Sequence, residues 1–162
     1  MHCKTIKMKI IVPIGISGSG KSTLYKGTFS DLNLVCPDLI RHELTGDISD
    51  QSCNGRVFKI VDERIEKHVQ NNEDVFYDAT NLNTKLRKKF VNKYKDNPNV
   101  EIIYYVLPAD VQTSLLRIRK DINNNVLRSK VPLYVLERQF DMYQESLKSI
   151  ESEGIKEIIY LQ

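Results

Sequence analysis

The residues best suited to chemistry lie in one glycine-rich stretch near the start of the chain, Gly15-Ile16-Ser17-Gly18-Ser19-Gly20-Lys21-Ser22-Thr23. Its spacing, G-x-x-x-x-G-K-[ST], is typical of a phosphate-binding loop when a strand precedes it and a helix follows it. Glycines let the backbone approach an anion closely, and the free N–H groups of a helix N-terminus point toward it. We therefore predict that this loop binds a nucleoside triphosphate.

The residue types in this stretch suggest separate roles. Lys21 can reach the β- and γ-phosphates, and the hydroxyl of Ser22 can ligate Mg²⁺. Ser17 and Ser19 either donate to phosphate or are simply small loop residues, and Thr23 is expected to belong mainly to the helix. ATP and Mg²⁺ are thus the expected ligands. The residues expected to contact the nucleotide are Gly15, Ser17, Gly18, Ser19, Gly20, Lys21, Ser22 and Thr23.

Two later stretches also carry polar side chains with functional spacing. Asp38 and Arg41 are three residues apart at an expected helix start, so they share a face. Asp38 is either a helix N-cap or a general base that takes a proton from an attacking hydroxyl. In the stretch Asp78-Ala79-Thr80-Asn81-Leu82-Asn83, Asp78 can hold Mg²⁺-bound water or orient a basic residue, whereas Asn81 and Asn83 suit a turn or a cap.

Apolar runs and helical periodicities alternate along the chain. Strands are expected at residues 8–14, 33–36, 74–77, 100–107 and 155–161. Helices are expected at residues 21–29, 38–46, 52–70 and 84–94, after a cap at Asp110, and from Pro132 until Gly154. Leu86, Phe90 and Tyr94 are predicted to share one helix face, and Leu136, Phe140, Tyr143, Leu147 and Ile150 to point inward.

This alternation predicts an α/β protein with the three-layer P-loop NTPase fold, a five-stranded parallel sheet with helices on both faces. In such a sheet the carboxyl ends of the strands meet at one edge, where ligands bind. The phosphate-loop stretch, Asp38 and residues 78–81 all follow expected strand ends. We therefore expect them to form one site.

Composition sets the broad class of the protein. The chain has 162 residues, 41% of them hydrophobic, 28% charged, with a net charge of +3. We expect a single domain over residues 1–162, with residues 1–7 as a loose extension. The three cysteines show no C-x-x-C spacing, which argues against a disulfide framework or a zinc site. No run reaches membrane-spanning length, so we expect no membrane association and a cytoplasmic location.

These motifs together resemble the phage-type polynucleotide 5′-kinase family. The resemblance extends from Met8 to about Leu147 and includes Asp38-x-x-Arg41, residues 78–83 and Val131-Pro132-x-x-Val135-Leu136. Members of that family transfer the γ-phosphoryl group of ATP to a 5′-hydroxyl end of DNA or RNA. The resemblance thus implies an enzyme of nucleic-acid end repair that uses ATP and Mg²⁺, without an obligate protein partner, in the host cytoplasm if it is phage-encoded.

The resemblance also implies residue roles. Lys21 and Ser22 match the phosphate lysine and the Mg²⁺ hydroxyl, Asp38 the aspartate that activates the acceptor, and Arg41 the arginine that fixes the acceptor end. Asp78 is close to a family aspartate near the acceptor, in a stretch that includes Thr80 and Asn81. Val131 lies where the family packs an apolar side chain near adenine. Family members also carry arginines on a lid, for which we favour Arg119 and Arg128, then Arg117; each is otherwise a solvated charge.

Other functions stay open at this point. A P-loop kinase of a nucleoside or another small alcohol would share the scaffold, as would a nucleotide-binding protein without transfer activity. An ATPase is a further alternative, because residues 75–78 resemble a Walker-B strand. The helix at 84–94 is rich in lysine, which indicates either a solvated face or a surface that holds the acceptor backbone.

Overall fold

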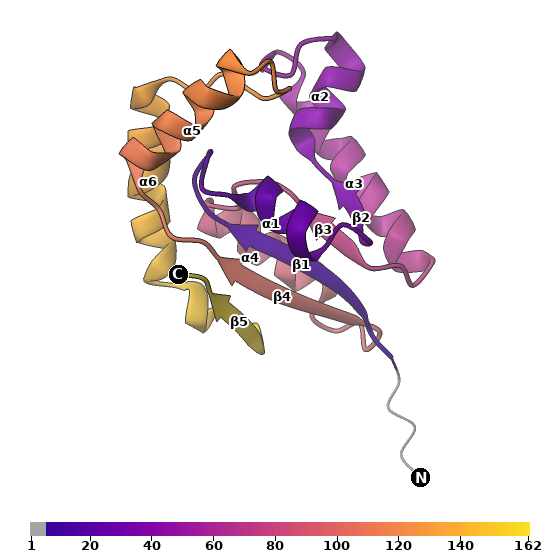
Figure 1. Ribbon diagram of the computed structural model, residues 1–162. Helices are drawn as coiled ribbons and strands as arrows, with labels where there is room; N and C mark the ends of the chain where they lie inside the picture. The colour runs from indigo at the N-terminus through magenta and orange to yellow at the C-terminus, as the bar shows by residue number, and fades with distance from the viewer. Residues whose placement is uncertain (1–5) are drawn as a thin grey trace.

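The computed structural model describes residues 6–162, which form one five-stranded sheet with helices around it (Figure 1). All strand pairs are parallel, in the order β2-β3-β1-β4-β5. The strands are β1 (Met8–Ile14), β2 (Asn33–Val35), β3 (Val75–Tyr77), β4 (Val100–Val106) and β5 (Glu157–Tyr160). This confirms the predicted α/β fold. Of the predicted loose extension, residues 1–5 lie outside the described range.

The helices cover both faces of this sheet. They are α1 (Lys21–Thr28), α2 (Pro37–Thr45), α3 (Asn54–Gln70), α4 (Thr84–Tyr94), α5 (Val111–Asn123) and α6 (Leu133–Leu147), with a short 3-10 turn, η1 (Ile150–Ser152). Side chains alternate between faces along a strand. Ile11 therefore packs on the side of α1, whereas Ile10 and Val12 pack against α3, α4 and η1. Burial on both faces explains why β1 reads as a continuous apolar run.

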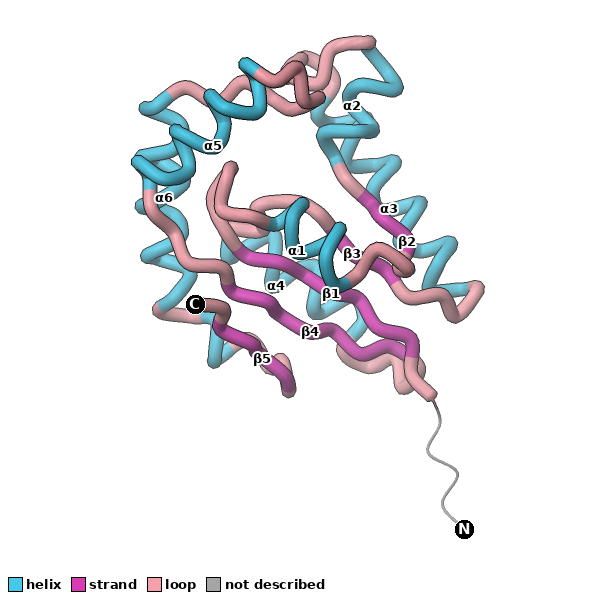
Figure 2. Tube along the Cα trace, viewed as in Figure 1, coloured by secondary structure: helices cyan, strands magenta, loops and turns pink. Residues whose placement is uncertain are grey.

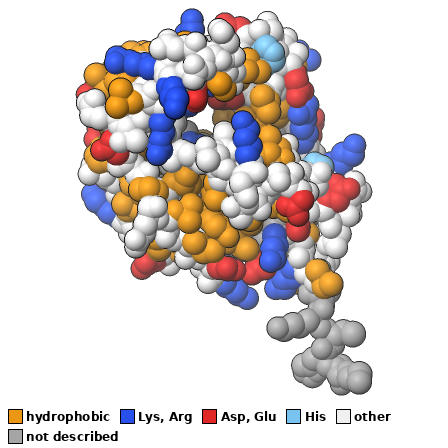
Figure 3. All heavy atoms as spheres, viewed as in Figure 1, with side chains coloured by type: hydrophobic (Ala, Val, Ile, Leu, Met, Phe, Trp, Pro, Cys, Tyr) orange, Lys and Arg blue, Asp and Glu red, His pale blue; other side chains and the backbone are white. Residues whose placement is uncertain are grey.

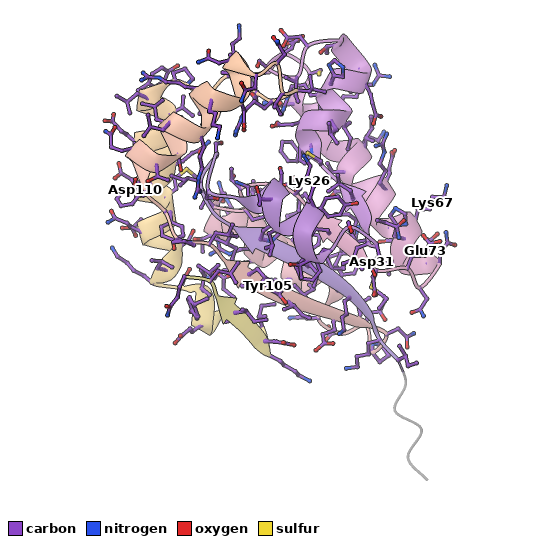
Figure 4. The ribbon with its side chains drawn as sticks, in the orientation of Figure 1. Lys26, Asp31, Lys67, Glu73, Tyr105 and Asp110 are labelled. Carbon is purple, nitrogen blue, oxygen red and sulfur yellow. The ribbon has the colours of Figure 1, made fainter. Side chains whose placement is uncertain are left out.

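Packing around α1 is aromatic. Phe29, which follows α1, meets Tyr105 of β4 edge-on, with ring centroids 5.1 Å apart, and also contacts Phe76 of β3. Figure 4 shows Tyr105 on the α1 side of the sheet. These contacts fix α1, and hence the turn that precedes it, against the central strands.

Two predictions about helices are wrong in detail. The last helix ends at Leu147 rather than near Gly154, and only the η1 turn continues it. Consequently Leu147 is exposed, while Ile150 reaches the core from η1. In α4 the buried face is Arg87, Val91 and Tyr94, whereas Leu86 is 62% exposed. Arg87 occupies a core position there because Glu153 neutralises it.

Helices α2, α5 and α6 and the loops that join them form the upper part of the molecule, beyond the carboxyl ends of the strands (Figure 2). Helices α5 and α6 rise on one side, and the lid loop that joins them, residues 124–132, crosses to the loop between α2 and α3. There the backbone N–H of Lys130 donates to the hydroxyl of Ser49, at 3.1 Å. The elements thus form a ring above the first strand. No helix within residues 6–162 combines the length and the hydropathy that a bilayer-crossing segment needs.

Candidate active site

The turn between β1 and α1, Gly15–Ser22, is a cradle of backbone groups that we call the phosphate loop. Gly18 and Gly20 have φ of 74° and 107°, in the left-handed region that favours glycine. A Cβ on Gly18 would lie 2.8 Å from the carbonyl oxygen of Ser114, so α5 packs directly on this turn. The first N–H groups of α1 have no helical acceptor. The hydroxyl of Ser19 is buried and has no partner within the described residues. These unpaired donors fit a phosphate.

Lys21 is buried inside the phosphate loop. Its ammonium donates to the carbonyl oxygens of Ile16 (2.7 Å) and Gly15 (3.2 Å). Burial lowers the pKa of Lys21 to about 8, and Arg128 adds to that effect, while Asp78 and Asp38 oppose it. A buried ammonium with a lowered pKa is stabilised by an anion placed beside it. The position of Lys21 therefore suits the contact with phosphate that the motif predicts.

Ser22 and Asp78 meet at the start of α1. The Ser22 hydroxyl donates to Oδ2 of Asp78 at 3.0 Å. Burial raises the pKa of Asp78, against the opposing effects of Lys21 and Ser22. A hydroxyl beside a carboxylate matches the oxygen chemistry of Mg²⁺, which commonly takes few protein ligands together with phosphates and water. Residues 6–162 contain no cluster of three or more His, Cys, Asp or Glu side chains able to hold a metal.

Asp38 and Arg41 form an ion pair near this centre. Cys36 is the N-terminal boundary of α2 and Pro37 its first residue, so Asp38 is not the helix cap. Arg41 is buried and donates to Asp38 (2.5 Å) and to Oδ1 of Asn54 (2.9 Å). The side chain of Asp38 is 47% exposed. Because its charge acts on both Lys21 and Asp78, the structure brings Asp38 to the phosphate loop as the strand ends predicted.

Residues 80–83 mainly form hydrogen bonds with backbone groups of the site. The carbonyl oxygen of Thr80 accepts from the N–H of Gly15 (3.1 Å). Asn81 has φ of 52°, and its side-chain amide donates to the carbonyl oxygens of Pro13 (2.9 Å) and Ala79 (3.1 Å). Asn83 caps α4. The donors of Asn81 are therefore occupied within the fold, and the expected contact of this stretch with the acceptor stays a prediction.

The lid arginines divide into two groups. The guanidinium of Arg117 donates to the carbonyl oxygen of Gly18 (3.2 Å), and Arg128 pairs with Asp121 close enough to Lys21 to lower its pKa. Arg119, two residues from Arg117 on α5, is exposed and forms no ion pair or hydrogen bond with another described residue. Residues two apart on a helix point in nearly opposite directions, so Arg119 does not share the contact of Arg117 with Gly18. Its place on the lid stays a prediction.

Two contacts around the loop have no signal in the sequence. Oε1 of Gln139, on α6, accepts from the backbone N–H of Ser17 at 2.8 Å. The residue before Val131, Lys130, donates its backbone N–H to the hydroxyl of Ser49. The residue before Ser49, Ile48, has a carbonyl oxygen that accepts a weak hydrogen bond from Arg41 (3.4 Å). The segment at Val131 thus borders the Asp38–Arg41 side of the site. Its expected place beside adenine stays a prediction.

The surface is hollowed above the phosphate loop. Figure 3 shows this hollow between α5 and α2, with Lys and Arg side chains on its rim. A second opening lies between the loop before α4 and helix α6, lined by Thr80, Leu82, Val135, Arg138, Gln139 and Met142. Gln139 belongs both to this lining and to the contact with Ser17. This opening therefore lies next to the α6 residue that contacts the phosphate loop.

Comparisons with known proteins bear on the fold and the family of the chain. A search of curated proteins finds no match. Among solved structures, a chain of the Pnkp1/Rnl/Hen1 RNA repair complex is 21% identical, over 91% of this chain and 48% of that chain, with a TM-score of 0.78. A chain of the PezAT chromosomal toxin–antitoxin system of Streptococcus pneumoniae is 17% identical, over 98% and 69%, with a TM-score of 0.72.

A gluconokinase from Sinorhizobium meliloti 1021 is also similar, at 14% identity over 98% of this chain and 83% of that chain, with a TM-score of 0.55. This chain spans about half the length of the repair-complex chain that it matches. At these identities the likeness is one of fold, the kinase-like P-loop fold, which implies nucleotide binding. A family described as an AAA domain matches residues 10–146, most of the sequence. The chain therefore belongs to the AAA domain family.

Proposed function

We propose that this protein transfers the γ-phosphoryl group of ATP to an alcohol, and that this alcohol is the 5′-hydroxyl end of DNA or RNA. One observation carries the proposal. A half-exposed carboxylate, Asp38, is held by the buried Arg41 within electrostatic reach of both Lys21 and Asp78. A protein that only binds nucleotide, or hydrolyses it, has no need of this pair.

The phosphate loop and Lys21 bind the β- and γ-phosphates. Ser22 and Asp78 would hold Mg²⁺, which when bound neutralises phosphate charge. Arg41 orients Asp38 so that a carboxylate oxygen accepts the proton of the attacking hydroxyl. The bond between that hydroxyl oxygen and the γ-phosphorus forms, the bond to the β–γ bridging oxygen breaks, and ADP leaves. Arg128, near Lys21, offsets charge on the transferred group, an effect worth about 10³–10⁵ in rate for such arginines.

Three features support a nucleic-acid acceptor. The Asp38-x-x-Arg41 pair and the Asp78-Ala79-Thr80-Asn81-Leu82-Asn83 stretch resemble the polynucleotide kinase pattern. The fold is similar to that of a chain in an RNA repair complex. The hollow above the phosphate loop also has a cationic rim (Figure 3), which suits a polyanion. The likeness to a gluconokinase makes a small polyol the competing acceptor.

The test uses γ-labelled ATP with four acceptors: a 5′-hydroxyl DNA oligonucleotide, the matching RNA, a nucleoside 3′-monophosphate and gluconate. We expect label on the nucleic-acid acceptors, and Asp38→Asn to reduce transfer by about 10²–10⁴-fold while ATP binding is kept. Asp31→Asn is the matched control, since Asp31 is exposed and away from the site (Figure 4). Near-full activity of Asp38→Asn, or label on gluconate alone, would contradict the proposal.

A further inference from the structure

Helix α4 carries an uncompensated basic surface, the lysine face, which consists of Lys85, Lys88 and Lys89. All three side chains are exposed, and none forms an ion pair with another residue in the range 6–162. The other two cations of α4 form ion pairs: Arg87 pairs with the buried Glu153, and Lys93 pairs with Glu66. The sequence of α4 contains no acidic residue. The lysine face therefore presents three free positive charges within two helical turns.

These charges are badly placed for the stability of the helix. Cations near a helix N-terminus oppose the helix dipole, which favours acidic residues there. The first turn of α4 has none, and Lys85 lies in it. Leu86, in the same turn, leaves 62% of its surface exposed. Neither feature helps α4 to fold, whereas both suit an anionic partner that also presents apolar surface, as single-stranded nucleic acid does.

The lysine face lies directly after the loop that lines the opening beside the site. Thr80 and Leu82, directly before α4, line the opening that Arg138 and Gln139 border on α6. Gln139 contacts the phosphate loop through Ser17. Arg138 is exposed and forms no ion pair with a described residue. From the phosphate loop outward, Gln139 thus leads to an opening that carries one exposed arginine, Arg138, and that ends directly before α4.

We propose that the lysine face binds the sugar–phosphate backbone of a single-stranded acceptor, beyond the nucleotide whose 5′-hydroxyl enters the site. This deepens the proposed function and rests on it. Lysines one helical turn apart, as Lys85 is from Lys88 and Lys89, are separated by about 5–6 Å at Cβ and share a face, so they can contact neighbouring phosphates. The contacts are with backbone charge, so DNA and RNA bind alike and base sequence matters little.

The experiment compares two triple variants that lose the same charge. Lys85→Gln/Lys88→Gln/Lys89→Gln removes the lysine face. Lys59→Gln/Lys67→Gln/Lys156→Gln removes three exposed lysines from α3 and the segment before β5, and Lys67 lies away from the site (Figure 4). Binding of a fluorescent sixteen-nucleotide strand is measured by anisotropy over a range of salt concentrations. We expect the first variant to bind on the order of tenfold more weakly, with a log–log salt slope shallower by about two, at 0.7 per lost phosphate contact. The second variant should match the wild type.

Transfer assays separate this inference from the proposed function. The lysine-face variant should lose kcat/KM for the sixteen-nucleotide acceptor but keep it for a nucleoside 3′-monophosphate, which is too short to reach α4. If the two triple variants bind the strand equally, or the short and long acceptors are affected alike, the lysine face is not a docking surface. If the wild type binds the strand with the expected salt slope but labels no 5′-hydroxyl, the proposed function fails while the docking surface stands.

Discussion

At the scale of single residues, the site depends on charges that are taken out of water and then compensated. Lys21 sits on the loop carbonyl oxygens of Gly15 and Ile16, and burial holds its pKa at about 8. A bound triphosphate favours the ammonium form and raises that pKa again. The protonation state of Lys21 therefore links nucleotide binding to pH.

This linkage predicts the direction of a pH effect. Above pH 8 the free protein has largely lost the Lys21 proton, so binding of ATP must take up about one proton, and its affinity falls by up to about tenfold per pH unit. At pH 7 the lysine is already charged, and uptake is near zero. Calorimetric titrations at pH 7 and pH 9, in buffers of different ionisation enthalpy, measure the number of protons taken up when ATP binds. Equal uptake at both pH values would show that the pKa of Lys21 is not lowered.

The sequence predicts the residues of the phosphate loop because local backbone geometry makes the cradle. It also places Asp38, because the carboxyl ends of parallel strands share an edge. It does not separate Arg117 from Arg119, since the choice depends on the rotation of α5 against Gly18. The sequence also does not predict that the side-chain amide of Asn81 donates to the carbonyl oxygen of Pro13, because the two residues are far apart in sequence.

At the scale of elements, the two lid helices hold adjacent residues of the phosphate loop. Arg117 of α5 donates to the carbonyl oxygen of Gly18, and Gln139 of α6 accepts from the N–H of Ser17. The hairpin of α5 and α6 thus contacts two adjacent residues of the loop. Any shift of this hairpin would change the orientation of the groups that face the phosphates.

Removing one attachment should loosen the loop without unfolding the protein. Gln139→Met keeps the size of the side chain but not its acceptor, and a hydrogen bond of this kind contributes about 0.5–1.5 kcal/mol. We expect the KM for ATP to rise about threefold to tenfold, with little change in kcat. Gln139→Glu, which retains an acceptor, should recover part of the loss, and Gln144→Met on the exposed side of α6 serves as control. An unchanged KM in Gln139→Met would remove any role for this contact.

At the scale of the whole molecule, one buried ion pair joins distant segments behind the site. Arg87 of α4 contacts Glu153 through two hydrogen bonds, at 2.8 Å and 2.5 Å, and also donates to the carbonyl oxygen of Asn81. Tyr104 of β4 donates to the same carboxylate at 2.8 Å. Burial raises the pKa of Glu153, but Arg87 and Tyr104 outweigh it and hold the pKa below its usual value. The network links the end of the chain to the loop that supports Asp78.

Breaking this pair should be costly. Arg87→Met leaves a buried, unpaired Glu153, and the free energy of unfolding should fall by about 3–5 kcal/mol. Arg87→Met/Glu153→Gln should recover part of that loss. The lowered pKa of Glu153 contributes its full stability above the unfolded value, near 4.5, and the wild type should lose this contribution as pH falls from there through the lowered pKa of the folded state. Urea unfolding at pH 7 and pH 4 measures both effects, and a single-variant loss below 1 kcal/mol would mean that the pair contributes little.

The sequence by itself determined the order of strands and helices, the phosphate loop and its ligand class, because these depend on apolar periodicity and on backbone geometry within a few residues. Only the tertiary structure decided which arginines approach the loop, that Gln139 secures it, and that Arg87 belongs in the core with Glu153. Those outcomes depend on how helices rotate and pack against one another. Such packing is set by contacts between residues many positions apart, which no local pattern encodes.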